Sequence, residues 1–441
     1  MARKYLLIVI SLLLLSVTPA VAQSEVEQLR KRVDSLEKEL RELKDILIKQ
    51  QQSSEKERAK VEKIEQKVTE TSSNVLSAFK FKPYGFIKLD AAYDDSRTDF
   101  GNFVLYVPSE SVHKDDNEFN MTARQTRLGL HIIAPEIYDW KVWGRIEFDF
   151  YGDASHENKA EPMLRHAFVE LKRGNFSLIA GQTNDLISPL YPYTLNYTVG
   201  WSAGNIGYRR AQLRATYIYP LNENTELIGA LALARTSGTV NEDLDLDLQN
   251  DGEDAGFPTV QARLALAIRL LTKKFTVFGI SGHYGEEEID WELNPFTLGE
   301  KQERVKSWSL NADINLPLTE RVSVQGEAFV GYNLDDYFGG ILQGVNPTTQ
   351  EVVKSAGGWL QLSYLHSDKW TYHLGCGIDD PKDNDLSAGM RNRNQFYFGN
   401  VVYSLIPPVD IVMEYSYWKT EYEKKRAGRA HRIQASIIYK W

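Results

Sequence analysis

The last eleven residues of the chain, 431–441, constrain the fold more than any other segment. Side chains alternate there with a period of two, with one apolar face and one largely polar face. The apolar set is Ile433, Ala435, Ile437, Tyr439 and Trp441. This pattern is typical of a β-strand with one face in an apolar environment, and a final strand that ends on an aromatic residue is typical of transmembrane β-barrels. The segment therefore predicts a membrane barrel, with Trp441 as the signal that the barrel-assembly machinery recognises.

The first 22 residues have the organisation of a secretory signal peptide. Arg3 and Lys4 precede the apolar run 5–15, and residues 20–22 have the small-x-small form that signal peptidase cleaves. No other stretch approaches the ~18 apolar residues of a transmembrane helix. We therefore expect an exported chain that begins at Gln23 and crosses the membrane with strands.

Composition agrees with an exported barrel. Only 42% of the residues are hydrophobic, as expected when each spanning strand is apolar on one face. The 23 Tyr, 18 Phe and 9 Trp residues are enough to form aromatic girdles at the membrane interfaces. The single cysteine, Cys376, excludes an intrachain disulfide and a cysteine metal cluster. The net charge of −9, without a basic run, argues against a nucleic-acid partner.

Residues 26–75 keep one heptad register. The a positions are Val26, Val33, Leu40, Leu47, Ser54, Val61, Val68 and Val75, and the d positions are Leu29, Leu36, Leu43, Gln50, Glu57, Ile64 and Thr71. We predict a periplasmic coiled coil over residues 23–71, followed by a polar linker at 72–80. A lone helix folding back on the barrel is the alternative, but its narrow seam would stay half exposed. Self-association is favoured, and we prefer a homotrimer because large porins are commonly trimers.

The remaining residues, 81–441, accommodate about 16 strands at about 10 residues each plus turns and loops. Period-two alternation recurs at 85–93, 142–150, 211–219, 260–268, 308–316 and 322–333. The fold prediction is an all-β transmembrane antiparallel β-barrel of about 16 strands with an N-terminal α-helical coiled coil. A barrel of that size encloses an aqueous channel, so we predict an outer-membrane diffusion porin for small hydrophilic solutes.

Long polar inserts between the strands predict external loops. They lie at 95–119, 153–163, 236–257, 286–305 and 334–355. The segment 191–201 differs from these, because it is aromatic and rich in turn residues and begins with Tyr191-Pro192-Tyr193. We regard it as the first candidate for a segment that folds inward and narrows the pore. An interfacial aromatic girdle is the alternative interpretation.

Arginines on the inward-facing parity suggest that the pore prefers anions. The set on regular strands is Arg127, Arg145, Arg210, Arg214, Arg263 and Arg269, and Arg124 and Arg165 lie at strand ends. A guanidinium group stays charged and can bind carboxylate or phosphate with two hydrogen bonds, so an arginine-lined wall favours small anionic solutes.

Inward carboxylates offer a second interpretation, in which the arginines form a structural ladder of ion pairs. These carboxylates are Asp90, Glu147, Asp149, Glu170, Asp313, Glu327 and Glu414. Most of the arginines lie in the first half of the barrel, whereas Asp313, Glu327 and Glu414 lie in the second half. We expect this segregation to produce a transverse field across the lumen that orients anionic or dipolar solutes.

Metal and catalytic sites have weak support. Residues 245–254 alternate acidic side chains around Gly252, but the twelfth position counted from Asp247 is Pro258 rather than Glu, so the segment is not an EF-hand. A solvated acidic loop is the simpler interpretation, and weak calcium binding that bridges to lipopolysaccharide is the alternative. The eight histidines lack zinc spacing, and residues 279–282 lack the end of a Gly-x-Ser-x-Gly elbow. We expect neither an enzyme nor a cofactor.

Several short motifs resemble those of the DcaP-like trimeric outer-membrane porins. They are YGFIKLDA (84–91), RQTRLG (124–129), GQT (181–183), GGILQG (339–344), GIDDP (377–381), NQ (394–395), GN (399–400), EY (414–415) and WKT (418–420). The resemblance implies a trimeric barrel of 16 strands with a periplasmic coiled coil, passing small anions such as dicarboxylates. Phosphate-selective porins share this layout and are the alternative family. A structural rival is an envelope tether, in which the barrel is an anchor and the coiled coil reaches peptidoglycan.

Overall fold

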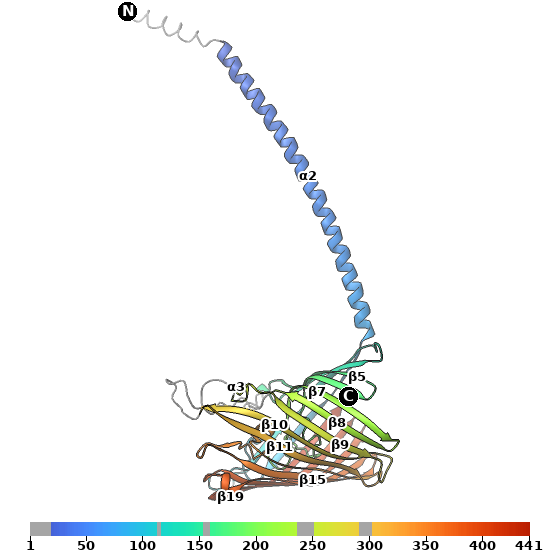
Figure 1. Ribbon diagram of the computed structural model, residues 1–441, viewed down its shortest axis with the longest axis vertical. Coiled ribbons are helices and arrows are strands. Elements are labelled where there is room, and N and C mark those ends of the chain that lie inside the picture. Colours follow the sequence, from blue (N-terminus) through green and yellow to red (C-terminus); the bar gives the residue numbers. More distant parts are fainter. Residues whose placement is uncertain (1–18, 113–115, 153–158, 236–250, 291–301) are drawn as a thin grey trace, which may run out of the picture. The chain divides into compact units, whose positions relative to one another are not determined.

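The computed structural model describes residues 19–112, 116–152, 159–235, 251–290 and 302–441. The chain divides into two compact units between Ala78 and Phe79. In the first unit, α2 (Pro19–Ala78) is one unbroken helix of 60 residues (blue in Figure 1). It continues through residues 72–78, where the sequence led us to expect a linker, because no Pro or Gly interrupts that stretch. Among the described residues, no helix combines the length and the apolar character needed to cross a membrane.

The second unit is a closed antiparallel β-barrel (Figure 1). Its strands are β1 (Lys80–Asp94), β2 (Glu118–Thr122), β3 (Arg127–Ile133), β4 (Lys141–Asp149), β5 (Met163–Arg173), β6 (Phe176–Asn184), β7 (Arg209–Asn222), β8 (Thr225–Ala234), β9 (Thr259–Ile268), β10 (Thr276–Asp290), β11 (Gln302–Pro317), β12 (Val322–Tyr332), β15 (Lys354–Ser367), β16 (Trp370–Pro381), β17 (Arg391–Ile406), β18 (Val409–Tyr422) and β19 (Lys425–Lys440). A two-residue hairpin, β13 (Val345–Asn346) with β14 (Glu351–Val352), lies outside this sheet. The other short elements are α3 (Asp251–Asp254), η2 (Asp335–Tyr337) and η3 (Asp383–Asp385).

Pairing of β1 with β19 closes the sheet, and the backbone N–H of Trp441 donates to the Gly85 carbonyl at 3.2 Å beside that seam. β2 and β3 both pair with β1, so they are two halves of one spanning strand that is interrupted at residues 123–126. The 17 strands of the sheet therefore make 16 spanning strands in the described part of the chain. The predicted barrel of about 16 strands is confirmed.

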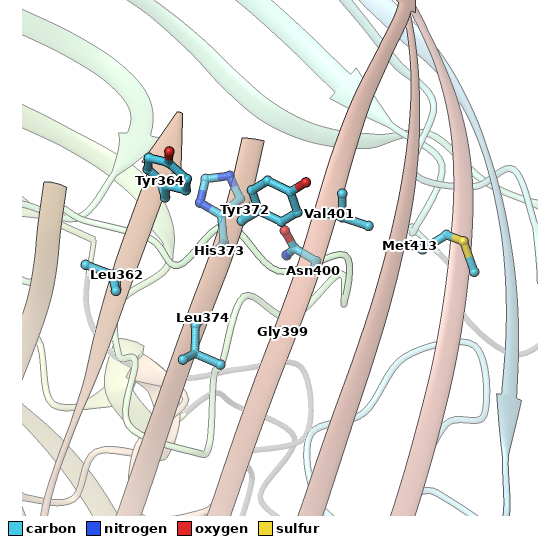
Figure 2. A pocket seen from close by; sticks show the side chains of 9 residues that line it. All are labelled: Leu362, Tyr364, Tyr372, His373, Leu374, Gly399, Asn400, Val401 and Met413. Atoms are coloured by element: carbon cyan, nitrogen blue, oxygen red, sulfur yellow. The ribbon is translucent and has the colours of Figure 1, made fainter. Parts of the chain in front are cut away.

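Side chains alternate between the lumen and the outer surface as the strand pattern predicts. On β1, Lys88 and Asp90 are buried inside the barrel, whereas Ile87 and Leu89 are exposed on the outer wall. Cys376 is also exposed on the outer wall. That wall is not smooth, because a groove of about 270 Å³ crosses β15 to β18 (Figure 2).

Tight turns connect the strands at one end of the barrel, and long connections lie at the other. The insert expected at 286–305 is shorter than predicted, because β10 and β11 pair as far as Asp290 and Gln302. Residues 236–250 lie outside the described residues, and with them most of the candidate calcium segment. In the described part of the chain, no group of three or more Asp, Glu, His or Cys side chains is arranged to hold a metal ion.

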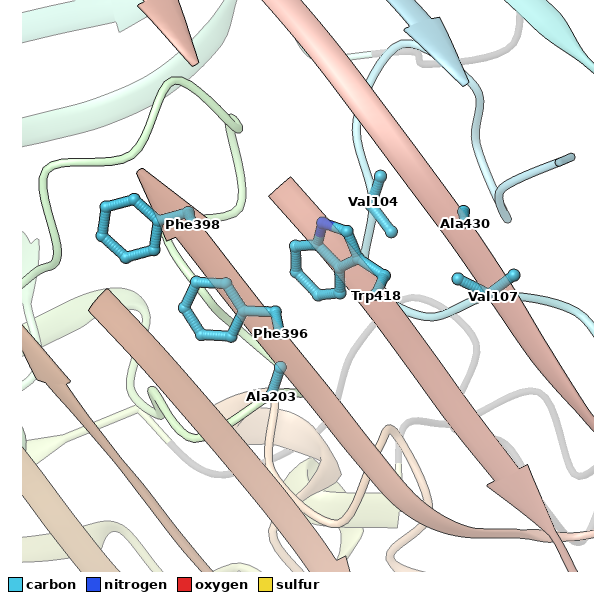
Figure 3. Close-up of a cluster of buried hydrophobic side chains, with 7 residues drawn as sticks. All are labelled: Val104, Val107, Ala203, Phe396, Phe398, Trp418 and Ala430. Carbon is cyan, nitrogen blue, oxygen red and sulfur yellow. The ribbon is translucent and has the colours of Figure 1, made fainter. Parts of the chain in front are cut away.

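Three long connections fold into the barrel mouth: loop A (residues 95–112), loop B (185–208) and loop C (333–353). Val104 and Val107 of loop A pack with Ala203 of loop B against the wall residues Phe396 and Trp418 (Figure 3). A second apolar cluster joins loops B and C and consists of Ile187, Ile206, Phe329, Leu334 and Tyr337. The apolar core of this unit therefore lies inside the barrel mouth.

Candidate channel interior

Loop B lies along the inner wall because side chains of that wall bind its backbone. The N–H groups of Leu190 and Leu195 donate to the carboxylates of Glu327 and Glu414, both at 2.7 Å. Gln261, Gln361 and Asn400 bind other backbone groups of the loop. Segment 191–201 therefore lies inside the barrel, as the inward-folding prediction expected, and not in an outer aromatic girdle.

This arrangement corrects the expected acidic half of the lumen. Glu327 and Glu414 are buried under loop B, where they accept hydrogen bonds. Asp313 is also buried and forms a two-point ion pair with Arg263, in which Nη2 and Oδ2 are 2.7 Å apart. The sequence could not show that these carboxylates are covered, and none of the three lines the lumen surface as an unpaired group.

On the opposite wall, three arginines converge over two carboxylates. Arg165 bonds Glu147 at 2.9 Å and Asp149 at 2.5 Å, Arg127 lies 3.4 Å from Glu147, and Arg145 also pairs with Glu147. The carboxylate side chains are 1% and 0% exposed, whereas those of the arginines are 12–27% exposed. Water in the lumen therefore meets guanidinium groups, and three cations over two anions leave one net positive charge.

Tyr84 supports this cluster from the neighbouring strand. Its hydroxyl donates to Glu147 at 2.7 Å, and its ring lies across Gly129. A Cβ at position 129 would approach the Tyr84 ring to 2.2 Å, so a side chain there would displace the tyrosine. Glycine at position 129 thus allows Tyr84 to reach the buried carboxylate.

Gly129→Val is expected to destabilise the barrel by about 1–3 kcal/mol, the usual cost of overpacking. Gly229→Val is the matched control, because no atom lies within 4 Å of a Cβ at that position. The measurement is urea unfolding followed by tryptophan fluorescence. A Gly129→Val midpoint equal to that of the control would contradict the close approach.

The remaining predicted arginines differ in their surroundings. Arg210 pairs with Asp185 at 2.9 Å and lies 4.1 Å from the Tyr337 ring centre, so it connects loops B and C. Arg214 donates to Gln212 at 2.9 Å and to the Asn184 carbonyl, and it has no ion pair with a described residue.

Two predicted arginines lie away from the lumen surface. Arg124 is 2% exposed in the break between β2 and β3, where its Nε donates to the Phe150 carbonyl at 3.0 Å. Arg269 follows the end of β9 and lies exposed in the turn before β10, bound to the carbonyls of Glu223 and Lys273. Its assignment to the lumen is wrong, because strand parity does not extend past the strand.

Arg209 was missed by the sequence reasoning, because parity places it opposite the inward Arg210. It is the first residue of β7, beside loop B, where strict alternation no longer holds. Its guanidinium lies 4.3 Å from the Tyr208 ring centre, and its Nε and Nη2 have no hydrogen-bond partner among the described residues.

The charge of Arg209 also acts on tyrosines of loop B. Burial raises the pKa of Tyr191 to about 12, and the charge of Arg209 opposes that rise. Burial likewise raises the pKa of Tyr197, against the charges of Arg209 and Arg165.

A closed barrel with an apolar outer wall, a charged lumen and an inward-folded loop defines an outer-membrane, porin-like channel. The chain belongs to the DcaP outer membrane protein family, whose family model matches residues 15–243, just over half of the sequence. Family and fold indicate a channel rather than an enzyme. No curated protein matches the sequence.

Solved structures share the fold. The outer membrane channel DcaP of Acinetobacter baumannii has a TM-score of 0.63 and 18% identity, over 83% of this chain and 98% of that chain. The anion-selective porin from Comamonas acidovorans has a TM-score of 0.52 and 11% identity, over 82% and 100%. The trimer form of OmpT from Vibrio cholerae has a TM-score of 0.50 and 9% identity, over 82% and 100%.

Proposed function

We propose that this chain is an outer-membrane diffusion porin whose lumen prefers small anions, dicarboxylates among them. The observation that carries the proposal is the layering of charge in the described part of the lumen. The guanidinium groups of Arg127, Arg145 and Arg165 are more exposed than the carboxylates beneath them, and Arg214 and the largely buried Arg209 have no ion pair with a described residue. A fixed positive wall of this kind attracts anions and repels cations.

The test is the reversal potential of purified protein in a planar bilayer across a KCl gradient. We expect stable channels with an anion-directed potential. A cation-directed potential would contradict the anion preference but would still be the behaviour of a porin. The chloride current is then measured with added succinate or added phosphate. Stronger inhibition by succinate would indicate a dicarboxylate preference, and stronger inhibition by phosphate would indicate a phosphate-selective porin. Folded, oligomeric protein without conductance would instead support the envelope tether.

We further propose that three copies assemble through α2 as a periplasmic coiled coil, after removal of residues 1–22. Apolar seam residues of α2 such as Leu36, Leu40 and Leu43 are 57–67% exposed on the single chain, and another helix would bury them. The trimeric form of OmpT offers a precedent for the number.

Deleting residues 23–71 is expected to weaken the oligomer and to leave each barrel folded. Dissociation by increasing detergent is measured by light scattering coupled to size exclusion. Heat-modifiable electrophoresis provides the control for barrel folding. If the deletion variant forms an oligomer as resistant to detergent as that of the full chain, α2 is a spacer of about 90 Å and does not hold the oligomer together.

A further inference from the structure

The outer wall at the long-loop end of β17, β18 and β19 carries two rows of side chains, one above the other. Tyr397, Tyr417 and His431 are register partners and form the aromatic row, in which the Tyr417 and His431 ring centres are 4.9 Å apart. The next outward positions toward the long loops place Lys419 beside Arg429. Aromatic rings followed by cations mark the boundary between apolar lipid and its headgroups.

Lys419 and Arg429 are register partners, and Arg393 lies one outward position further toward the long loops on β17, opposite Glu421; we call these three side chains the cationic row. Their side chains are 28–51% exposed, and each also contacts a partly exposed carboxylate from the set Asp380, Glu421 and Glu110. The β18–β19 turn adds three exposed cations, which form no ion pair with a described residue: Lys424, Lys425 and Arg426. Glu423 of the same turn opposes them, so these six cations against four carboxylates leave two net positive charges at this end of the outer wall.

Loop A holds this hairpin in a fixed position. Ser109 donates to the Arg426 carbonyl at 2.6 Å, and the Val107 N–H donates to Thr420 at 2.8 Å. Glu110 of the same loop pairs with Arg429 at 3.1 Å. The cations therefore need little further ordering to bind a ligand, which favours affinity.

Below the two rows, the groove of about 270 Å³ opens on the membrane-facing side of the same sheet (Figure 2). Leu374 and Met413 project at its edges and are 64% and 54% exposed, while Gly399 leaves its floor without a side chain. Gly399 is six residues from Arg393 on β17, which corresponds to about 20 Å along the strand. One ligand could therefore contact both features only if it had an anionic head and a long apolar chain.

We infer that this face binds lipopolysaccharide, with phosphate groups of lipid A on the cationic row and an acyl chain in the groove. The inference rests on the proposed orientation, in which the long loops are extracellular and face the outer leaflet. Free anions that enter the pore are a different ligand, because the cationic row faces away from the lumen.

The test compares binding of lipid A and of dephosphorylated lipid A to the purified oligomer in detergent, by thermophoresis. Wild-type protein is expected to bind lipid A at least tenfold more tightly than the dephosphorylated form. The double variant Lys419→Gln, Arg429→Gln is expected to lose that difference. Its matched control is Lys273→Gln, Lys274→Gln, which removes two exposed cations at the short-turn end and should behave as wild type.

A second variant tests the groove. Gly399→Leu fills its floor, and a Cβ there lies an ordinary 3.6 Å from Leu374, so folding should be unaffected. We expect several-fold weaker binding of both lipids, with the preference for phosphate kept. Wild-type affinity in both this variant and the double variant would overturn the inference.

Two other outcomes would also overturn it. One is equal binding of the two lipids by wild-type protein, and the other is dissociation of the oligomer in the Lys419/Arg429 variant with unchanged lipid A affinity. The latter would make this face a contact between copies of the chain. Conductance and reversal potential are recorded on the same preparations. If the proposed anion preference is wrong, the reversal potential will show it while lipid A binding stays the same, so the two proposals fail independently.

Discussion

Replacing Arg209 and Arg214 together by glutamine is expected to lower the anion-to-cation permeability ratio by up to roughly thirtyfold. Neither guanidinium has an ion pair with a described residue, although Arg209 is only 8% exposed. At about 8 Å in water, one such charge stabilises a passing anion and destabilises a passing cation by about 0.5 kcal/mol each, so the two charges together change the free-energy difference between the ions by about 2 kcal/mol. The measurement is the reversal potential at low ionic strength, because salt screens the interaction.

The design of this experiment depends on leaving the buried carboxylates paired. Arg145→Gln is a poor choice, because it would take a partner from Glu147, whose side chain is only 1% exposed. The control is the pair Lys273→Gln, Lys274→Gln, which removes the same charge from an exposed turn. An unchanged potential in the Arg209/Arg214 variant would show that these two side chains do not set selectivity.

Replacing Glu327 and Glu414 together by alanine is expected to release loop B from the wall and to increase single-channel conductance and its fluctuations. Each glutamate accepts a backbone N–H of the loop at 2.7 Å, and an intramolecular hydrogen bond contributes about 0.5–1.5 kcal/mol to stability. Glu414 also binds Thr194 and Asn400, which would lose a partner. Conductance is measured in planar bilayers with protein whose barrel is shown to be folded by heat-modifiable electrophoresis.

The matched variant replaces both glutamates by glutamine, which removes the same charge and keeps an acceptor oxygen. A change in selectivity shared by the two variants reports the charge, whereas a conductance change confined to the alanine variant reports the loop. Wild-type conductance in the alanine variant would mean that apolar packing alone holds loop B.

The sequence predicted side-chain direction wherever a strand is regular. Glu147 and Asp90 were placed inside and are buried there, because successive side chains of a strand must point to opposite faces. The same reasoning failed at strand ends. Arg269 lies one residue past β9, and Arg209 is the first residue of β7.

Partners of loop B could not be predicted. Its turn-rich, aromatic composition indicated that segment 191–201 was unusual, but the bond from Leu195 to Glu414 spans 219 residues. Such a contact exists only once the barrel has closed. For the same reason, the sequence identified inward glutamates but could not distinguish those facing water from those under a loop.

The common core of loops A, B and C limits how such barrels can be recombined. Ala203 of loop B packs with Val104 of loop A, and Trp201 stacks on Phe338 of loop C with ring centres 4.5 Å apart. A chimeric porin that received loop B alone would place these apolar surfaces against foreign partners or water. We expect functional chimeras only when all three loops are exchanged as one module together with the wall residues beneath them, and natural substitutions in one loop to be accompanied by changes in the other two.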